Sequence, residues 1–178
     1  MKAFLRFVLR QWPLCAAVVS VAMLAIAHAF EQFGGLDPCV LCLRQREVYW
    51  TALAIGIAGF VLQRVPGRPW LVRLSCVALA ITFAVGVGVA AYHAGVEWKW
   101  WPGPQACAAA GGAASVGDNT AVFGGAAKVR APSCDEAVWI FLGLSMAGWN
   151  AAVSLVLAGF SVCAAMCRPW LAPKDDVA

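Results

Sequence analysis

Leu74–Val96 reads LSCVALAITFAVGVGVAAYHAGV, and this stretch without a charged residue decides the fold. A helix rises about 1.5 Å per residue, so about 20 residues cross a hydrocarbon core about 30 Å thick. The stretch is therefore long enough to span a membrane as one helix. Three further runs without charge occur along the chain: Gln11–Phe30, Val48–Gln63 and Ala137–Cys167.

The composition of the whole chain favours the same class. Hydrophobic residues make up 62% of the 178 residues, and charged residues only 12%. A soluble domain of this length needs more charge on its surface, so we reject the alternative of an aggregation-prone soluble core. We predict an all-α membrane protein, a bundle of four transmembrane helices within a single domain that covers residues 1–178.

We place the four spans at residues 12–30, 41–63, 74–95 and 143–166. The second run is short, and its span therefore includes residues that precede it. Arg44, Arg46 and Glu47 then lie close to the interface or face the bundle. The fourth run is longer than one span requires, and we expect its first turns to lie along the membrane surface.

The distribution of basic residues orients the bundle. Short loops and span ends with many Lys and Arg residues face the cytoplasm, which places both termini there and the loops 31–40 and 96–142 on the other side. The alternative is a cleavable secretory signal that ends near Ala27-His28-Ala29, but the charge distribution favours a retained first helix. The basic residues of the cytoplasmic face are Lys2, Arg6, Arg10, Arg64, Arg68, Arg73, Arg168 and Lys174.

The eight cysteines form two groups. Four lie inside or at the cytoplasmic ends of the apolar runs, where cysteine is usually a small buried hydrophobe. We assign no function to these four, which are Cys15, Cys76, Cys163 and Cys167. The others lie on the opposite side of the membrane, in a compartment that permits disulfides. They are Cys39, Cys42, Cys107 and Cys134.

Cys39 and Cys42 form a Cys-x-x-Cys unit at the expected start of a helix. We expect Asp37 as the N-cap and Pro38 at the first helical position. Both cysteines then lie in the first turn, where unpaired N–H groups and the helix dipole lower the pKa of a thiol. Arg46 follows on the same helix face as Cys42. So small a loop stabilises a fold little, and the spacing therefore favours a disulfide that opens and closes.

Cys107 and Cys134 flank residues 108–127, a stretch dominated by Ala and Gly. On its own the pair could form a structural disulfide worth roughly 3–4 kcal/mol. Beside a Cys-x-x-Cys unit at the same membrane face, it is better interpreted as a mobile partner in thiol–disulfide exchange. The rival interpretation is a Zn(Cys)₄ site helped by His93, which lacks the second closely spaced cysteine pair of a zinc knuckle.

Several motifs follow one another in a fixed order along the chain. They are Cys39-Val40-Leu41-Cys42 with Arg46, His93 after the third span, Cys107 and Cys134 in the second outer loop, and Phe141–Met146 leading to Trp149. In this combination the chain resembles the DsbB family of bacterial inner-membrane disulfide bond formation proteins. The resemblance covers nearly the whole chain, from the first span to the fourth.

The resemblance implies a four-helix bundle in the bacterial inner membrane with its active cysteines on the periplasmic side. It implies that the protein oxidises a soluble periplasmic dithiol protein, DsbA or a DsbA-like thioredoxin-fold protein, and passes two electrons to ubiquinone or menaquinone. The expected partners are thus the dithiol protein, the quinone and the lipid bilayer, and none of them is a nucleic acid. A DsbI-like oxidase for one dedicated partner shares these motifs and stays an alternative.

The resemblance also implies a role for each motif residue. Cys107 corresponds to the cysteine that the thiolate of the partner attacks, and Cys134 to its disulfide partner. Exchange with the Cys39–Cys42 pair then moves the electrons inward. Cys42 corresponds to the thiolate that engages the quinone ring. The quinone-binding residues are then Arg46 beside Cys42 and His93 near the same site.

Physical chemistry supports the role of Arg46. A reduced quinone develops oxyanion charge that a nearby cation stabilises, and an arginine at membrane depth is costly without such a task or a partner. The alternatives are an interfacial anchor for Arg46 and a merely solvated ring for His93. Arg44 and Glu47 receive no role from the sequence.

Overall fold

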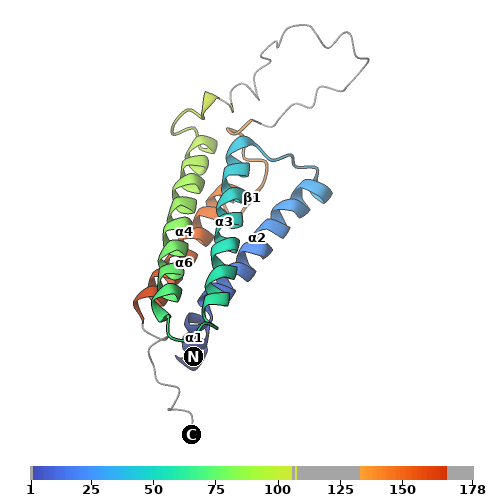
Figure 1. Ribbon diagram of the computed structural model, residues 1–178. Coiled ribbons are helices and arrows are strands. Elements are labelled where there is room, and N and C mark those ends of the chain that lie inside the picture. The colour runs from blue at the N-terminus through green and yellow to red at the C-terminus, as the bar shows by residue number, and fades with distance from the viewer. Residues whose placement is uncertain (1, 106, 108–132, 168–178) are drawn as a thin grey trace.

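The computed structural model describes residues 2–105, 107 and 133–167 of the chain. Within this part, four long helices form a bundle, with a short helix at one end and a hairpin of two short strands beside the last long helix (Figure 1). The elements are α1 (Lys2–Arg10), α2 (Trp12–Gly34), α3 (Val40–Leu62), α4 (Pro69–Glu97), β1 (Ile140–Phe141), β2 (Leu144–Ser145) and α6 (Met146–Met166).

Three of the long helices, α2, α4 and α6, have the length and apolar composition that a membrane span requires. Helix α3 is as long as α2, at 23 residues, but it is less apolar. Its first two turns carry Arg44, Arg46 and Glu47. The described part of the chain therefore has three candidate spans and one further helix of comparable length.

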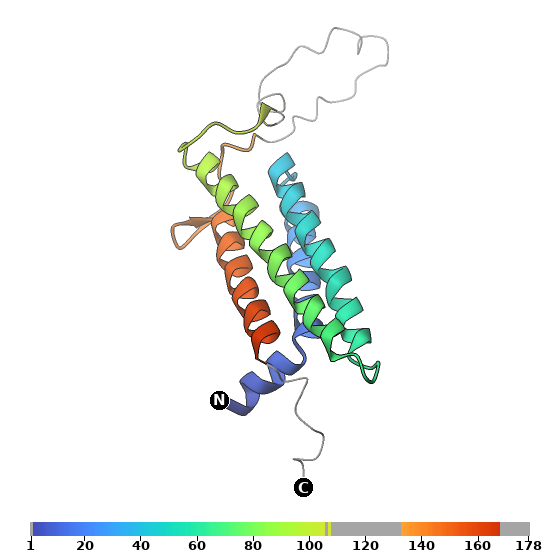
Figure 2. The same cartoon turned by 60° about the vertical axis from the view of Figure 1, so that its left-hand side comes forward.

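Helix α4 joins the bundle together. It packs against both α6 and α3, and α3 packs in turn against α2 (Figure 2). Leu79 and Phe83 of α4 are fully buried at the centre of the core. Helix α2 belongs to the same core, because Trp12 is buried and its Nε1 donates a hydrogen bond of 2.9 Å to Ser161 Oγ on α6.

Two glycines bring α3 very close to its neighbours. A Cβ atom on Gly56 would lie 2.7 Å from the carbonyl oxygen of Pro13, and one on Gly59 would lie 2.5 Å from Ser75 Oγ. Small residues permit such close approach between membrane helices. We call this half of the bundle, with α1, the end of α3 and the start of α4, the α1 half. The opposite half, with the start of α3, the end of α4 and the hairpin, is the site half.

The segment before α6 differs from expectation. Strands β1 and β2 pair antiparallel, and the two residues between them, Leu142 and Gly143, have positive φ values of 52° and 79°. Two successive residues with positive φ are typical of a type I′ hairpin turn. Helix α6 begins only at Met146, where Ser145 Oγ caps it by accepting a hydrogen bond from the Gly148 N–H. The expected helical turns along the membrane surface are therefore wrong.

The other helices extend beyond the expected spans. Helix α2 continues past residue 30 to Gly34, and α4 begins at Pro69 rather than at residue 74. Helix α1 was not expected as a separate element. The helix is interrupted at Gln11, whose backbone leaves the helical conformation (φ −100°, ψ 19°). Pro13 follows in the first turn of α2.

Candidate redox site

The Cys-x-x-Cys unit lies at the start of α3, with a cap that differs from expectation. Cys39 itself is the N-cap: its backbone is extended, and its Sγ accepts a hydrogen bond of 3.3 Å from the backbone N–H of Cys42. Asp37 as the cap and Pro38 as the first helical residue were therefore wrong, because the helix begins only at Val40. The free N–H of the helix start thus reaches the sulfur of Cys39, which favours a thiolate there.

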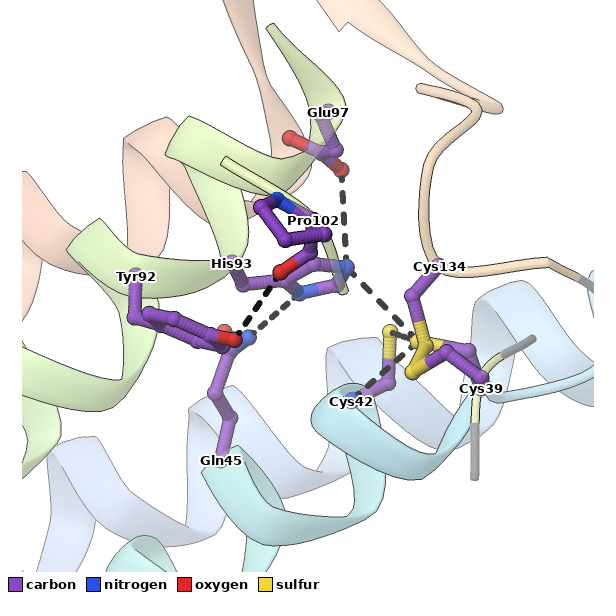
Figure 3. The surroundings of a disulfide bond; sticks show 9 residues. Cys39, Cys42, Gln45, Tyr92, His93, Glu97, Pro102 and Cys134 are labelled. Atoms are coloured by element: carbon purple, nitrogen blue, oxygen red, sulfur yellow. Dashed lines mark hydrogen bonds and ion pairs between the residues drawn. A yellow bond between two sulfur atoms is a disulfide. The ribbon is translucent and has the colours of Figure 1, made fainter. Parts of the chain in front are cut away.

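Two neighbours act on the Cys39 sulfur (Figure 3). The Sγ atoms of Cys39 and Cys42 are 3.1 Å apart, and Nε2 of His93 lies 3.6 Å from Cys39 Sγ. Hydrogen bonding with the Cys42 thiol lowers the pKa of Cys39 below its ordinary value, burial opposes this change, and His93 adds to the lowering. The geometry therefore favours Cys39 as the thiolate of the pair.

Cys107 and Cys134 form a disulfide, with their Cα atoms 5.5 Å apart. Both residues pack in one apolar cluster with Cys39, and Cys42 contacts the same cluster. All four predicted cysteines therefore meet at the start of α3, in the site half. Cys107 and Cys134 are only 5% and 1% exposed. The disulfide is therefore buried in this arrangement.

The disulfide is incompatible with a Zn(Cys)₄ site made of these four cysteines. Cys107 and Cys134 are bonded to each other, so the structure has no site in which four thiolates surround one ion within its described residues. In the same part of the chain, Cys39, Cys42 and His93 are the one group of three possible metal ligands with donor atoms within 4.8 Å of one another.

Arg46 lies on the face of α3 that turns toward α2. Its Nη1 is 2.6 Å from Oε2 of Glu31, and its Nη2 donates to the carbonyl oxygen of Ala27 at 3.2 Å. The side chain is 15% exposed. Arg46 is thus a half-buried cation tied to α2 rather than a free interfacial anchor. Arg44 instead pairs with Glu47 at 2.9 Å, on the exposed face of the same helix.

His93 is buried near the end of α4, with 3% of its surface exposed. Its Nδ1 is 2.8 Å from Nε2 of Gln45, and its Nε2 is 3.8 Å from Oε1 of Glu97. The alternative of a merely solvated ring is therefore wrong. Oε2 of Glu97 is buried without a hydrogen-bond partner among the described residues.

A cavity of about 420 Å³ opens beside these groups. Cys42, Arg46, His93 and Glu97 contribute to its wall. The hairpin closes one side, and Trp149 Nε1 on α6 fixes it by donating to the carbonyl oxygen of Phe141 at 2.9 Å. Ligand sites are commonly apolar hollows with a few convergent polar groups, as here. Much of the remaining wall is apolar, including Met23, Phe30, Trp139, Phe141, Met146 and Trp149.

Sequence reasoning missed four polar residues of this site. Glu31 was visible as the first acidic residue after the first apolar run, and Asn150 as an amide within the fourth. Gln45 stood between the basic residues of a noted motif, and Glu97 at the end of the third run. Each was a polar residue inside or next to an expected span, which is the signal that marks functional positions in membrane helices.

Comparison with known proteins identifies relatives along most of the chain. The sequence profile of the family described as "Disulfide bond formation protein DsbB" matches residues 9–164. Disulfide bond formation protein B of Nitrosococcus oceani is 29% identical over 147 residues, which cover 79% of this chain and 81% of the relative. The protein of the same name from Methylococcus capsulatus is 30% identical over 144 residues, with 79% and 84% covered. Disulfide bond formation protein B 2 of Pseudomonas putida is 30% identical over 159 residues, with 84% and 86% covered.

The family match agrees with the apolar helices and with the cysteine cluster at one end of the bundle. A disulfide packed against a pair of thiols is the arrangement that a disulfide-forming oxidoreductase requires. The chain is an integral membrane protein of this kind, and it belongs to the DsbB family of disulfide bond formation proteins.

Proposed function

We propose that this protein is a thiol:quinone oxidoreductase of the bacterial inner membrane, which reoxidises a DsbA-like periplasmic dithiol protein. The observation that carries the proposal is the order of groups in the site half. A disulfide, Cys107–Cys134, packs against Cys39, and Cys39 is paired with Cys42 on the wall of an apolar cavity. Electrons can pass along this order from a soluble partner to a molecule dissolved in the membrane.

The first step is an exchange at the outer disulfide. A thiolate of the partner attacks Cys107 Sγ, which forms a mixed disulfide and releases Cys134 as a thiolate. The second thiol of the partner then resolves the mixed disulfide. The partner leaves as a disulfide, and Cys107 and Cys134 are left as two thiols that hold its two electrons and two protons.

The second step is an exchange within the protein. Cys107 and Cys134 reduce a Cys39–Cys42 disulfide through the contact that Cys39 makes in their cluster, and they become a disulfide again. Cys39 and Cys42 then carry the two electrons and two protons as thiols. This is the arrangement of the described residues, with an outer disulfide and two inner thiols.

The cavity beside Cys42 fits a quinone ring. Its volume lies in the range of small-molecule sites, and aromatic side chains line one wall. A bound ubiquinone or menaquinone would accept two electrons and two protons as Cys39 and Cys42 become a disulfide. Arg46 would hold the developing negative charge, and Cys42, Arg46 and His93 would contact the ring.

The proposal places four spans in the membrane, with α3 as the second, and both termini in the cytoplasm. Two ion pairs support a span at α3, because Arg46 with Glu31 and Arg44 with Glu47 neutralise most of the charge in its first turns. Helix α1 and the connection from α3 to α4 lie at the same end of the bundle, opposite the cysteine cluster (Figure 1). Both segments are basic, which the positive-inside rule assigns to the cytoplasm.

Turnover of a quinone tests the proposal directly. The purified chain is mixed with a reduced DsbA-like protein and a soluble ubiquinone analogue, and the loss of quinone absorbance is followed. We expect turnover by the native chain and only background with Cys42→Ser. Cys163→Ser is the matched control, because Cys163 is exposed at the other end of the bundle. An inactive native chain, or full activity of Cys42→Ser, would contradict the proposal.

A second experiment tests the order of the cysteines. A partner whose second cysteine is replaced by Ser should accumulate as a mixed disulfide at Cys107 of the native chain, because the thiol that resolves this intermediate is absent. Peptide mapping after alkylation identifies the attachment residue. Attachment of the partner at Cys39 would show that the proposed order of electron transfer is wrong.

A further inference from the structure

A chain of buried polar side chains leads away from the redox site into the bundle. Nε2 of Gln45 is 2.8 Å from Nδ1 of His93, Asn150 Nδ2 donates to Gln45 Oε1, and Tyr49 Oη donates to Asn150 Oδ1. Each of these four residues is at most 8% exposed. The chain connects α4, α3 and α6, and its first links lie beside the two thiols (Figure 3).

The three hydrogen bonds run in one direction. The amide nitrogen of Gln45 is a donor only, so Nδ1 of His93 must accept and carries no proton. The neutral ring then holds its proton on Nε2, because the hydrogen bond to one ring nitrogen decides the state of the other. The opposite direction requires both amides to turn over and Tyr49 to donate to Ser154 Oγ, which is farther away at 3.3 Å.

The protonated nitrogen faces the reactive sulfur. Nε2 of His93 is 3.6 Å from Cys39 Sγ, and Cys39 is the sulfur that geometry favours as a thiolate. We propose that Gln45, held in place by Asn150, is a positioning residue that keeps the Nε2 proton of His93 directed at the Cys39 thiolate. The inference rests on the proposed function, since it gives His93 and Cys39 their tasks in the relay.

The surroundings of His93 are compatible with a neutral donor. The titratable groups that face the ring are Cys39 and Cys42 from α3 and Glu97 from its own helix. Helix α6 is connected to the ring indirectly, because the uncharged amide of Asn150 donates a hydrogen bond to Gln45. The N–H of Gln45 needs an acceptor at this distance, so the hydrogen bond requires an unprotonated Nδ1. Arg46 on the cavity wall is then the cation of the site.

The chain supplies its own reference for this proposal. It has two histidines, His28 and His93. Nδ1 of His28 lies 2.8 Å from the carbonyl oxygen of Leu24. A carbonyl oxygen only accepts, so Nδ1 of His28 carries a proton. In their neutral forms the two rings should therefore be opposite tautomers.

Nitrogen NMR of the full chain, labelled with ¹⁵N-histidine, tests the tautomers without turnover. The reduced native protein in lipid nanodiscs should show one neutral ring protonated at Nδ1 and one at Nε2, and His28→Gln should remove the first. Gln45→Leu should turn the second ring into a mixture of tautomers. Gln45→Glu should move its proton to Nδ1, because a carboxylate accepts. A native His93 protonated at Nδ1, or an unchanged spectrum in Gln45→Leu, would overturn the proposal.

Quinone reduction gives the second readout. We expect Gln45→Leu to lower kcat about 10- to 100-fold with little change in the KM for quinone, as for the loss of a partner that orients a histidine. Asn150→Leu should act in the same direction. Gln45 also lines the cavity, so a higher KM with unchanged kcat would make it a contact of the quinone and would overturn the proposal.

The matched control is Ser161→Ala, which removes a buried hydrogen bond with Trp12 in the α1 half. It should change neither the histidine spectrum nor kcat. Failure of the two proposals can be told apart. A chain with the expected tautomers and no quinone turnover contradicts only the proposed function, whereas turnover with the other tautomer contradicts only the role of Gln45.

Discussion

The two halves of the bundle use the same helix in opposite ways. In the α1 half, α3 presents Gly56 and Gly59, and neighbouring atoms fill the space that a Cβ would need. In the site half, the same helix presents Cys42 and Arg46 to a cavity of about 420 Å³. Close packing therefore holds the helices together at one end and leaves room for chemistry at the other. Substitutions in the site half should change turnover, and those in the α1 half should change stability.

The largest expected effect is that of Arg46→Met on quinone reduction. Loss of a group that stabilises an oxyanion lowers kcat by about 10²- to 10³-fold. The half-buried Glu31 also loses its partner, so Glu31→Gln is measured alongside to separate the two contributions. Arg46→Lys should recover part of the rate, because it keeps the positive charge but not the pair of contacts that the guanidinium makes with Glu31 and Ala27 of α2. Native turnover by Arg46→Met would show that quinone reduction does not depend on Arg46 as the cation of the site.

The next effect concerns the thiolate at Cys39. Because its pKa is lowered, the Cys39 thiolate persists below the ordinary thiol value of about 8.5 and is lost only as the pH falls through the lowered value. Cys42→Ala removes the main cause of the lowering and should raise the pKa of Cys39. Each unit of that rise reduces the thiolate about tenfold at a pH below both values.

Thiolate absorbance measures this titration. The pH-dependent ultraviolet spectrum of Cys42→Ala is compared with that of the double variant Cys39→Ser/Cys42→Ala, so that the other thiols cancel. The same subtraction for the native chain uses Cys39→Ser. Equal titration of Cys39 with and without Cys42 would mean that the helix start and His93 alone hold the thiolate.

Sequence patterns predicted the features that are local in the chain. The apolar runs located the long helices, and Asp37 with Pro38 indicated a helix start close to the observed one, because both signals depend on neighbouring residues. The cap at Cys39 instead of Asp37 was missed, since a sulfur is seldom considered as a capping acceptor. The hairpin was missed because Leu142, a bulky residue, adopts a positive φ that its type rarely shows.

Contacts between side chains of different helices could not be predicted from the sequence. Arg46 was identified as a cation in need of a task, but its partner Glu31 lies on another helix and depends on how α2 and α3 pack. Gln45 and Asn150 are separated by 105 positions. Single-sequence patterns carry no signal for such a pair. The buried polar chain therefore required the structure.

Substitutions in the α1 half should lower the free energy of unfolding. Gly56→Val places side-chain atoms against the backbone of Pro13, and overpacking of this kind costs about 1–3 kcal/mol of unfolding free energy. Denaturation in detergent micelles measures the loss. Gly88→Val is the matched control, because no atom lies within 4 Å of a Cβ placed there. The folded fraction of Gly56→Val should keep native kcat, and a fall in kcat per folded molecule would contradict the division between the two halves.

The smallest expected effect comes from the second arginine of α3. Arg44 pairs with Glu47 on the exposed face, where both side chains are more than 60% exposed, and such pairs contribute about 0–1 kcal/mol. Arg44→Met should therefore leave quinone turnover near native, although it removes the same charge only two positions from Arg46. Arg44 lies on the exposed face of the helix, whereas Arg46 faces the cavity, so position rather than net charge should decide the effect. Equal losses in Arg44→Met and Arg46→Met would instead point to a general attraction by the basic start of α3, and Arg46 would lose its specific place beside the quinone.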